Sequence, residues 1–408
     1  MLRVISFALA ALAVMTTRAD DPAVRWWKGN LHTHSLWSDG DEFPEMIGDW
    51  YKKHGYHFLA LTDHNVLSQG ERWMRVSDVV KRSDAGVLDR YKERFGDHWV
   101  ETRGESGGTD FEVKLKPLSE FRHLLEESEQ FLFIQAEEIS DRAEGKPVHI
   151  NATNIVEVIP PARGDTVRAA MQNNLRAIIE HGKQHGINVL PHVNHPNFGF
   201  AMTAEDLAAV VAEEFFEVYN GHPGVNHLGD DDHPSIERMW DLINAIRRTR
   251  LDAPLMMGIA VDDSHEYHGQ PGSHPGRGWV MVRSLFLTPE HIVAAIKRGD
   301  FYASSGVELI DVVRDGSSGT LRLSIKPEDG VTYRTDFIAT LRGDENLGDD
   351  QRIGVVVATS TDLRPSYSLT DTELYVRAVV TSSRPHVDPS FEGQKQQAWI
   401  QPLSATKH

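Results

Sequence analysis

Short hydrophobic runs alternate with amphipathic segments over residues 26–301 of this chain. The runs at 58–61 and 131–134 have the length of buried strands, and residues 166–185 have the hydrophobic spacing of a long helix. The alternation of strand and helix repeats six or seven times, which is typical of parallel strands covered by helices. The pattern therefore predicts an α/β fold of barrel dimensions.

Two segments depart from this alternation. Residues 67–128 are charged, contain several helical pieces and are interrupted by glycines, so we interpret them as a helical insertion after the second strand that lies over one face of the barrel. Residues 306–408 are rich in β-branched side chains that alternate with polar ones between turn clusters. We therefore expect a barrel domain over residues 20–305 and a small C-terminal antiparallel β module.

The first 19 residues have the pattern of an export signal. Arg3 precedes a short apolar run, and Ala19 closes a small-residue cleavage site. The run is shorter than the roughly 18 residues that a membrane-spanning helix needs. We expect a cleaved signal peptide and a periplasmic or secreted protein without a membrane anchor, with an uncleaved N-terminal anchor as the alternative.

Composition narrows the possible chemistry. The 408 residues include 42 Lys and Arg against 60 Asp and Glu, a net charge of −18, which disfavours nucleic acid and anionic membranes as partners. The chain has no cysteine, which excludes disulfides, thiolate metal ligands and cysteine nucleophiles. The 21 histidines are unusually many, so a metal site here would be built from His, Asp and Glu.

The densest chemical motif follows the first predicted strand. His32 and His34 are two residues apart, a spacing that places both imidazoles on one side of an extended backbone. Asp39 follows in a Ser-Asp-Gly turn that can bring its carboxylate back over the strand end. A histidine pair of this kind also occurs by chance in surface loops, so the motif alone does not establish a metal site.

Further candidate ligands lie at or next to later predicted strands, and the carboxyl ends of parallel strands converge on one face of an α/β barrel. Charged groups gathered there would be costly without a cation to neutralise them. We therefore predict a metal centre on this face. The candidates are Asp63 and His64, Glu137 and Glu138, His149, His192 and His195, and Asp262, Asp263 and His265.

The order of these motifs resembles the polymerase-and-histidinol-phosphatase (PHP) superfamily over residues 26–305. Stretches around residues 26–65, 194–197, 217–222 and 276–279 are similar to its exported carbaryl-hydrolase-like metallohydrolases. The resemblance implies a distorted (β/α)7 barrel with two or three divalent ions. It assigns His32, His34, Glu138 and Asp263 to a first ion, Glu138, His149 and His195 to a second, and Asp39, His64 and His265 to a third.

Several neighbouring residues compete for these assignments. The resemblance favours Glu138 over Glu137 and His195 over His192, leaving His192 a possible supporting role, and the Asp-x-His spacing favours Asp263 over Asp262. Asp63 is expected to accept a hydrogen bond that fixes a ligand imidazole. Four histidines in late loops are further candidates to reach a substrate: His222, His227, His268 and His274.

Nitrogen and oxygen ligands without thiolate suit Zn²⁺, Mn²⁺ or Fe²⁺, and two or three such ions activate water for hydrolysis. We expect a hydrolase of small-molecule esters, with phosphoesters favoured over carbamate or carboxyl esters. Asp39 or His265 would assist proton transfer, and Arg277 would bind an anionic substrate group. The alternative outside enzymology is a periplasmic metal- or ligand-binding protein without turnover.

Overall fold

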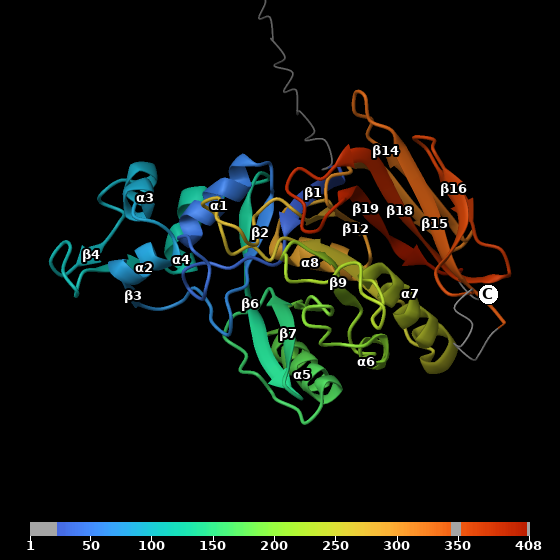
Figure 1. Cartoon of the computed structure of the whole chain (residues 1–408), viewed down its shortest axis with the longest axis horizontal. Helices are drawn as coiled ribbons and strands as arrows, with labels where there is room; N and C mark the ends of the chain where they lie inside the picture. Colours follow the sequence, from blue (N-terminus) through green and yellow to red (C-terminus); the bar gives the residue numbers. More distant parts are fainter. Residues whose placement is uncertain (1–22, 344–351, 406–408) are drawn as a thin grey trace, which may run out of the picture.

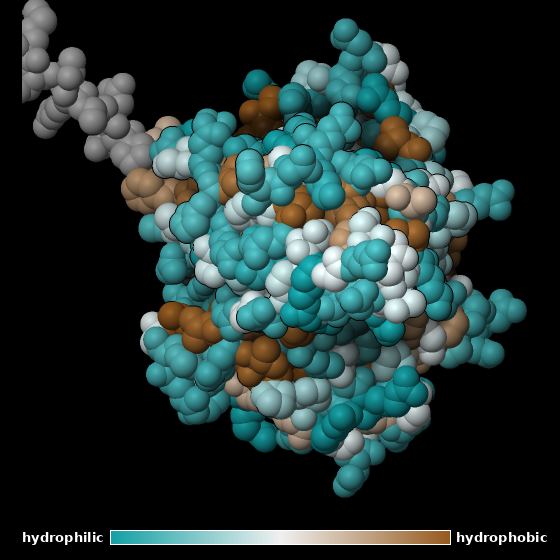
Figure 2. Space-filling model, turned by 90° about the vertical axis from the view of Figure 1, so that its left-hand side faces the viewer, coloured by the Kyte–Doolittle hydropathy of each residue, from teal (hydrophilic) through white to brown (hydrophobic). Residues whose placement is uncertain are grey.

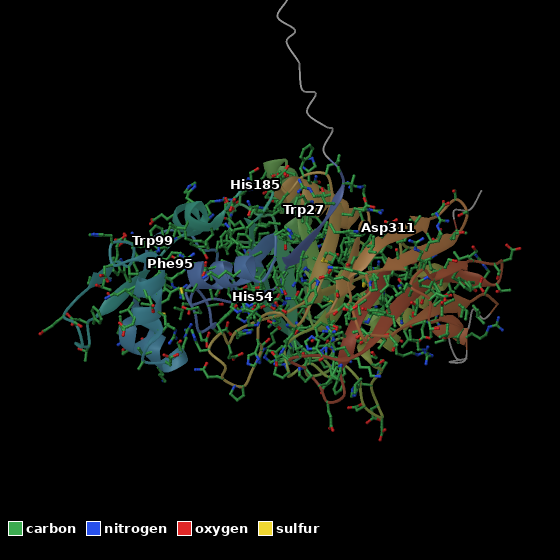
Figure 3. All side chains as sticks on the ribbon, turned by 90° about the horizontal axis from the view of Figure 1, so that it is seen from above. Trp27, His54, Phe95, Trp99, His185 and Asp311 are labelled. Atoms are coloured by element: carbon green, nitrogen blue, oxygen red, sulfur yellow. The ribbon has the colours of Figure 1, made fainter. Side chains whose placement is uncertain are left out.

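The computed structural model describes residues 23–343 and 352–405. The predicted signal peptide at 1–19 lies outside these ranges. Figure 1 shows three regions along the long axis: the 67–128 segment at one end, the main sheet with its helices in the middle, and the C-terminal strands at the other end. Figure 3, seen from above, places Phe95 and Trp99 of the 67–128 segment and Asp311 of the C-terminal region on opposite sides of Trp27.

The main sheet has 13 strands in the order β10-β9-β8-β7-β6-β2-β1-β11-β12-β19-β18-β15-β16. Nine of these strands belong to the predicted barrel domain. They are β1 (Arg25–Asn30), β2 (Phe58–Leu61), β6 (Leu132–Ala143), β7 (Lys146–Thr153), β8 (Leu190–Val193), β9 (Phe215–Asn220), β10 (Met257–Val261), β11 (Trp279–Ser284) and β12 (Phe301–Ser304).

The α/β class is confirmed, but the sheet is mixed rather than all parallel. β1, β2 and β6 pair in parallel, as do β8, β9 and β10, whereas β7, β11 and β12 run antiparallel to their neighbours. Ile259 of β10, at one edge of the sheet, shares a hydrophobic cluster with Trp27 of β1 and Val280 of β11. This contact between strands that are far apart in the strand order shows that the sheet curls. An isolated parallel bridge joins Thr33 to Ser264 beyond the ends of β1 and β10. Within the described residues this bridge does not extend into a ladder, so the expected closed (β/α)7 barrel is not seen.

The β6–β7 hairpin explains part of this difference. Its two-residue turn is Glu144-Gly145, with φ of 53° and 76°, the left-handed values that a tight hairpin turn requires at both central positions. The predicted strand at 131–134 becomes a 12-residue strand, and Glu137 and Glu138 lie inside it rather than at its end. Local sequence did not reveal the hairpin, because glutamate is an uncommon residue in such a turn.

Helices cover the sheet and bury its hydrophobic face. Ile178 of α5, Leu207 of α6 and Trp240 of α7 belong to one hydrophobic cluster with residues of β7, β8 and β9, and Ile292 of α8 packs in the cluster of β1 and β10. The helices outside the 67–128 segment are α1 (Pro44–Lys53), α5 (Val167–His185), α6 (Ala204–Ala209), α7 (Ile236–Ile246), the π-helical turn η1 (Arg247–Leu251) and α8 (Pro289–Lys297).

The 67–128 segment contains the predicted helical pieces, but it also contains a small sheet that the prediction of a helical insertion did not include. A three-stranded antiparallel sheet in the order β3-β5-β4 shares a hydrophobic cluster with α2 and α3, whereas α4 packs against α1 and the main sheet. Figure 2 shows that this end of the molecule has a mostly hydrophilic surface with isolated hydrophobic patches. Its elements are β3 (Arg72–Arg75), α2 (Val76–Arg82), α3 (Val87–Phe95), β4 (Thr102–Arg103), β5 (Glu112–Leu115) and α4 (Leu118–Leu125).

The C-terminal region is antiparallel, as its alternating pattern predicts, but its main strands continue the central sheet. β19 pairs with β12 at Tyr302, Ala303 and Ser304, and the second small sheet has the order β13-β14-β17. The strands are β13 (Leu309–Asp315), β14 (Thr320–Ile325), β15 (Tyr333–Leu341), β16 (Val355–Ser360), β17 (Ser366–Ser368), β18 (Glu373–Pro385) and β19 (Lys395–Leu403).

None of the described helices combines the length and the hydrophobicity that crossing a membrane requires.

Candidate metal centre

Two histidines from the end of β1 form the floor of the centre. The Asn30 side-chain oxygen accepts the backbone N–H of His32 at 2.9 Å and so fixes the turn that follows β1. His32 and His34 are both fully buried, with ring centroids 5.1 Å apart. Burial lowers the pKa of His34 to about 3, so this imidazole is neutral and has a lone pair for a cation.

Two carboxylates from distant segments face the same histidine atoms. Asp263 Oδ1 lies 3.2 Å from His32 Nε2 and 3.1 Å from His34 Nε2, and the Glu138 oxygens lie 3.5 Å from each. Asp263 has a φ of 50°, a left-handed backbone conformation that is unfavourable for a non-glycine residue. Such strain persists where surrounding contacts hold it, here the bond from Asp263 N–H to the His32 carbonyl oxygen at 3.0 Å.

Three buried atoms in this group make no hydrogen bond, namely His32 Nε2, His34 Nε2 and Glu138 Oε2, although Glu138 Oε2 lies 2.7 Å from His64 Nδ1. An unpartnered buried polar atom is costly, and native proteins pair nearly all of them. Here the two nitrogens and the carboxylate oxygen face one another around Asp263. A divalent cation would satisfy all of them at once, so the residues fit a metal ion.

Glu138 extends the group toward two further histidines. Its Oε1 lies 2.9 Å from His149 Nδ1 and 3.5 Å from His195 Nε2, and accepts the Asn194 amide at 2.8 Å. Burial opposes ionisation of Glu138, but the surrounding histidines outweigh it and hold its pKa well below the usual range. A buried carboxylate kept ionised between several imidazoles is a suitable bridge between two cations.

A third group lies on the solvent side. Asp39 Oδ2 is 3.3 Å from His64 Nε2, and Asp39 Oδ1 is 3.5 Å from His265 Nε2. The Nδ1 of His265 is 2.9 Å from the Asp263 carbonyl oxygen, a contact in which Nδ1–H donates and leaves the Nε2 lone pair facing Asp39. The side chain of Asp39 is 53% exposed, so this part of the cluster is open to a substrate.

The nine residues predicted as ligands therefore lie in one connected cluster, each within 3.6 Å of another member. They come from the loops after β1, β2 and β10, from the interior of β6 and β7, and from the loop after β8. The set is His32, His34, Asp39, His64, Glu138, His149, His195, Asp263 and His265.

The competing acids have other partners. Glu137 accepts the Ile159 N–H at 2.6 Å on the opposite side of β6, and burial raises its pKa to about 7. Asp262 accepts the backbone N–H groups of residues 276–278 and the Tyr51 hydroxyl, and burial raises its pKa to about 6. Both acids therefore anchor neighbouring loops.

Asp63 fixes a loop rather than an imidazole. It accepts the backbone N–H and hydroxyl of Ser35 at 2.8 and 2.7 Å and the hydroxyl of Ser38 at 2.6 Å. We expected Asp63 to accept a hydrogen bond from a ligand imidazole, but its donors are Ser35 and Ser38, so this expectation was wrong. The effect of Asp63 is on the 35–39 turn, which carries Asp39 into the third group.

Glu217 is the functional candidate that sequence reasoning missed. This fully buried carboxylate of β9 lies 2.6 Å from His32 Nδ1 and 3.2 Å from His192 Nε2, and accepts the backbone N–H of His195 at 2.7 Å. Burial opposes its ionisation, but His32 and His192 outweigh it and lower its pKa to about 2. The available signal was an acid inside the otherwise apolar strand 215–219, which burial makes costly without partners.

Arg277 lies in the correct loop, but its donors are engaged by the protein. The guanidinium makes two bonds of 2.9 Å to Asp388 and further bonds to the carbonyl oxygens of Gly221 and Gly272 and to His274. The side chain is 5% exposed. Binding a substrate anion would require it to give up these partners, so the structure offers no free donor for the predicted role.

Of the late-loop histidines, His222 lies at the cluster, with its ring edge-to-face on His265 at 5.8 Å. The Nε2 of His227 contacts the Asn220 carbonyl oxygen at 2.7 Å, His268 pairs with Glu42 at 3.1 Å and His274 with Asp388 at 2.8 Å. These three contacts are structural.

No protein-family model matches this chain, and no curated protein matches its sequence. Among solved structures, the chain is similar to a two-domain protein from Bacteroides vulgatus that contains a predicted PHP-like metal-dependent phosphoesterase. The identity is 17% and the TM-score 0.40, over 93% of this chain and 95% of that one. It is also similar to a Chromobacterium violaceum amidohydrolase with bound sulfate and no metal, at 14% identity and a TM-score of 0.29, over 60% and 90% of the two chains.

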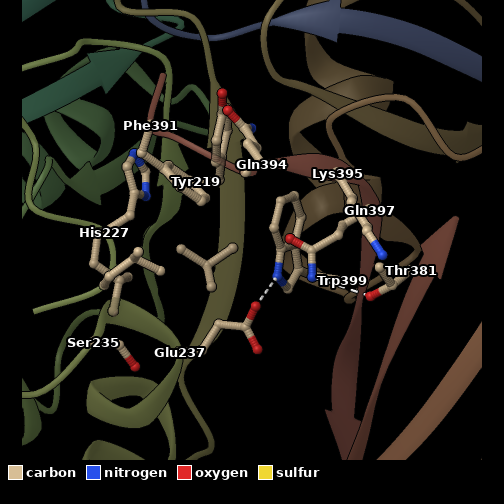
Figure 4. A pocket seen from close by; sticks show the side chains of 14 residues that line it. Tyr219, His227, Ser235, Glu237, Thr381, Phe391, Gln394, Lys395, Gln397 and Trp399 are labelled. Atoms are coloured by element: carbon tan, nitrogen blue, oxygen red, sulfur yellow. Dashed lines mark hydrogen bonds between the residues drawn. The ribbon is translucent and has the colours of Figure 1, made fainter. Parts of the chain in front are cut away.

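Two other features lie apart from the cluster. A cavity of about 350 Å³ between β9, α7 and the C-terminal strands is lined by Tyr219, His227 and Trp399, and Figure 4 shows the Trp399 indole donating to Glu237. Glu157, His181 and His185 gather near the end of α5, where His181 is buried and the other two are exposed. There the His181 Nε2 already accepts a backbone N–H, at 3.2 Å.

Proposed function

We propose that this protein is a metal-dependent hydrolase of the PHP type that acts on phosphate esters. The observation that carries the proposal is the set of buried atoms of His32, His34 and Glu138 that make no hydrogen bond and gather around Asp263. The cluster opens to solvent at Asp39, which gives a substrate access to one side of it. Export to the periplasm or the medium, directed by residues 1–19, is part of the same proposal.

Each group of ligands would hold one ion. His32, His34, Glu138 and Asp263 would hold the first, and Glu138 would share a second with His149 and His195. Asp39, His64 and His265 would hold a third, of lower affinity because its carboxylate is exposed. Nitrogen and oxygen donors of this kind suit Zn²⁺, Mn²⁺ or Fe²⁺. When bound, such ions acidify water and stabilise negative charge on the group under attack.

The chain's own residues supply order and proton transfer. Glu217 orients His32, and the Asp263 carbonyl oxygen orients His265, so that each presents its Nε2 to the cluster. Asp39 is held ionised, since burial is outweighed by His64, His34 and His265, which lower its pKa. As the exposed carboxylate of the cluster, it is the group placed to take a proton from the attacking water at Oδ1 or Oδ2.

The test is a hydrolysis screen on the purified chain. p-Nitrophenyl phosphate, bis(p-nitrophenyl) phosphate, p-nitrophenyl acetate and p-nitrophenyl N-methylcarbamate are compared with and without chelator, followed by addition of Zn²⁺, Mn²⁺ or Fe²⁺. We expect phosphoester cleavage that chelator abolishes and one metal restores. A strong preference for the acetate or carbamate would move the substrate class to neutral esters. Metal binding without turnover of any substrate would support a binding protein instead.

A further inference from the structure

Arg72 and Arg82 of the 67–128 segment lie beside the turn that carries Asp39. The Arg72 guanidinium donates to the carbonyl oxygen of Trp37 and stacks over that ring at 5.3 Å, and Arg82 donates to the carbonyl oxygen of Ser38. These two acceptors immediately precede Asp39 in the chain. The two arginines therefore lie at the solvent-open rim of the candidate metal centre.

Neither guanidinium has a carboxylate partner among the residues described. The other five arginines of the same segment are all ion-paired, at distances of 2.5 to 3.1 Å. They pair as Arg75 with Asp78, Arg90 with Asp84, Arg94 with Asp49, Arg103 with Glu112 and Arg122 with Glu126. Arg72 and Arg82 thus differ from the other arginines of this segment in having no ion pair within the described residues.

The two charges also repel each other. Burial lowers the pKa of the half-buried Arg72, and Arg82 lowers it further, while Asp63 acts in the opposite direction. A guanidinium has five N–H donors in a planar fork that matches phosphate and carboxylate oxygens. In each of the two arginines, Nη1 donates to a backbone carbonyl oxygen, whereas Nε and Nη2 have no protein partner within the described part of the chain.

We propose that Arg72 and Arg82 form an anion subsite that holds a second anionic group of the substrate, away from the bond that the metal centre cleaves. The proposal rests on the proposed function and narrows its substrate class to esters with two anionic groups, such as a phosphate ester that carries another phosphate. The 67–128 segment, rather than the loop of Arg277, then selects for substrate charge.

The binding test uses two nucleotides that differ by one phosphate. Thymidine 5′-monophosphate and thymidine 3′,5′-bisphosphate are titrated by calorimetry into the zinc-loaded full chain. We expect the bisphosphate to bind about tenfold or more tightly in the wild type, as a charge-assisted contact provides. Arg72→Gln and Arg82→Gln should each reduce this ratio toward one, Arg82→Lys should retain part of it, and Arg75→Gln, which removes an ion-paired arginine of the same strand, should leave it unchanged.

Turnover is measured on the matching pair of p-nitrophenyl esters, thymidine 5′-(p-nitrophenyl phosphate) with and without a 3′-phosphate. An arginine-dependent affinity ratio without hydrolysis would leave the subsite standing and contradict the hydrolase proposal. A wild-type ratio near one would overturn the subsite. An affinity ratio that stays at the wild-type value in both Arg72→Gln and Arg82→Gln would also overturn the subsite. This holds even if Arg82→Gln loses metal, because the arginines would then only support the turn that carries Asp39.

Discussion

The carboxylate of Glu217 lies 2.6 Å from the Nδ1 of His32, at a position where both side chains are fully buried. The Nδ1–H of His32 donates to this carboxylate, and the Nε2 of the same ring faces Asp263 and Glu138. Glu217 also accepts the backbone N–H of His195, so one buried acid orders two of the candidate ligands.

Glu217→Gln should therefore weaken metal binding without abolishing the fold. The amide has no negative charge to hold His32 in the required tautomer, and loss of such a partner typically costs 10- to 100-fold in metal affinity. Zn²⁺ affinity is measured by competition with a chelating dye. Glu213→Gln is the matched control, because Glu213 is a buried acid just before the same strand. Equal affinities for wild type and Glu217→Gln would show that Glu217 is only structural.

Glu138→Gln and Glu137→Gln should distinguish a carboxylate that is shared by two metal ions from one that only anchors a neighbouring loop. Glu138 contacts five of the candidate histidines, whereas Glu137 accepts a backbone N–H on the other side of the strand. We expect the first variant to lose at least one ion per chain together with most activity, and the second to keep its metal. Metal content is measured by mass spectrometry of the elements after desalting. The reverse pattern would mean that the bridging acid was misassigned.

Arg277→Gln should reduce stability rather than discriminate between substrates. The change removes the Asp388 pair and leaves the carbonyl oxygens of Gly221 and Gly272 without their donor. Loss of buried, charge-assisted contacts of this kind costs about 2–4 kcal/mol. Denaturant unfolding of Arg277→Gln and Asp388→Asn compares the two partners, with Arg277→Gln expected to be the less stable. A selective loss of activity on anionic esters, with stability unchanged, would restore Arg277 as a substrate-binding residue.

Glu213 should make stability depend on pH. Burial raises its pKa to about 8 in the folded chain, so between the unfolded value near 4.5 and that pKa the folded state holds a proton that the unfolded state has released. Its contribution to stability therefore falls as pH rises through this window. Glu213→Gln should gain in Tm relative to wild type at pH 8 and gain less at pH 5. A Tm difference that is the same at both pH values would contradict the burial of an acid with this pKa.

The gathering of candidate ligands could be predicted from local spacing and from the convergence of strand ends, whereas their assignment to individual ions came from the resemblance to the PHP superfamily. The i, i+2 spacing of His32 and His34 places both imidazoles on one side of an extended segment. The Asp-x-His spacing also selected Asp263 and His265, although Asp263 has a left-handed backbone that the spacing does not predict. Burial of the neighbouring strands then forces these ends together. The α/β class followed from the same local periodicities.

The remaining features depend on contacts that the local pattern does not contain. Arg277 meets Asp388 from 111 residues away, and Arg72 meets the turn after β1 from 35 residues away. The β6–β7 hairpin, which moves Glu138 into a strand interior, depends on a left-handed Glu144 that propensity does not favour. The role of Glu217 can be recognised only from its contacts with His32 and His192, which the fold brings beside it.

The most direct test of the central claim is stepwise reconstitution of the metal-free protein. The chain is stripped with chelator, and hydrolysis of its best p-nitrophenyl phosphoester is followed as Zn²⁺ or Mn²⁺ is added in fractions of an equivalent. The account predicts no activity without metal and a rise to a plateau at two to three ions per chain, with the plateau lost in Glu138→Gln. Full activity in the stripped protein, or no phosphoester cleavage at any metal ratio, would contradict it.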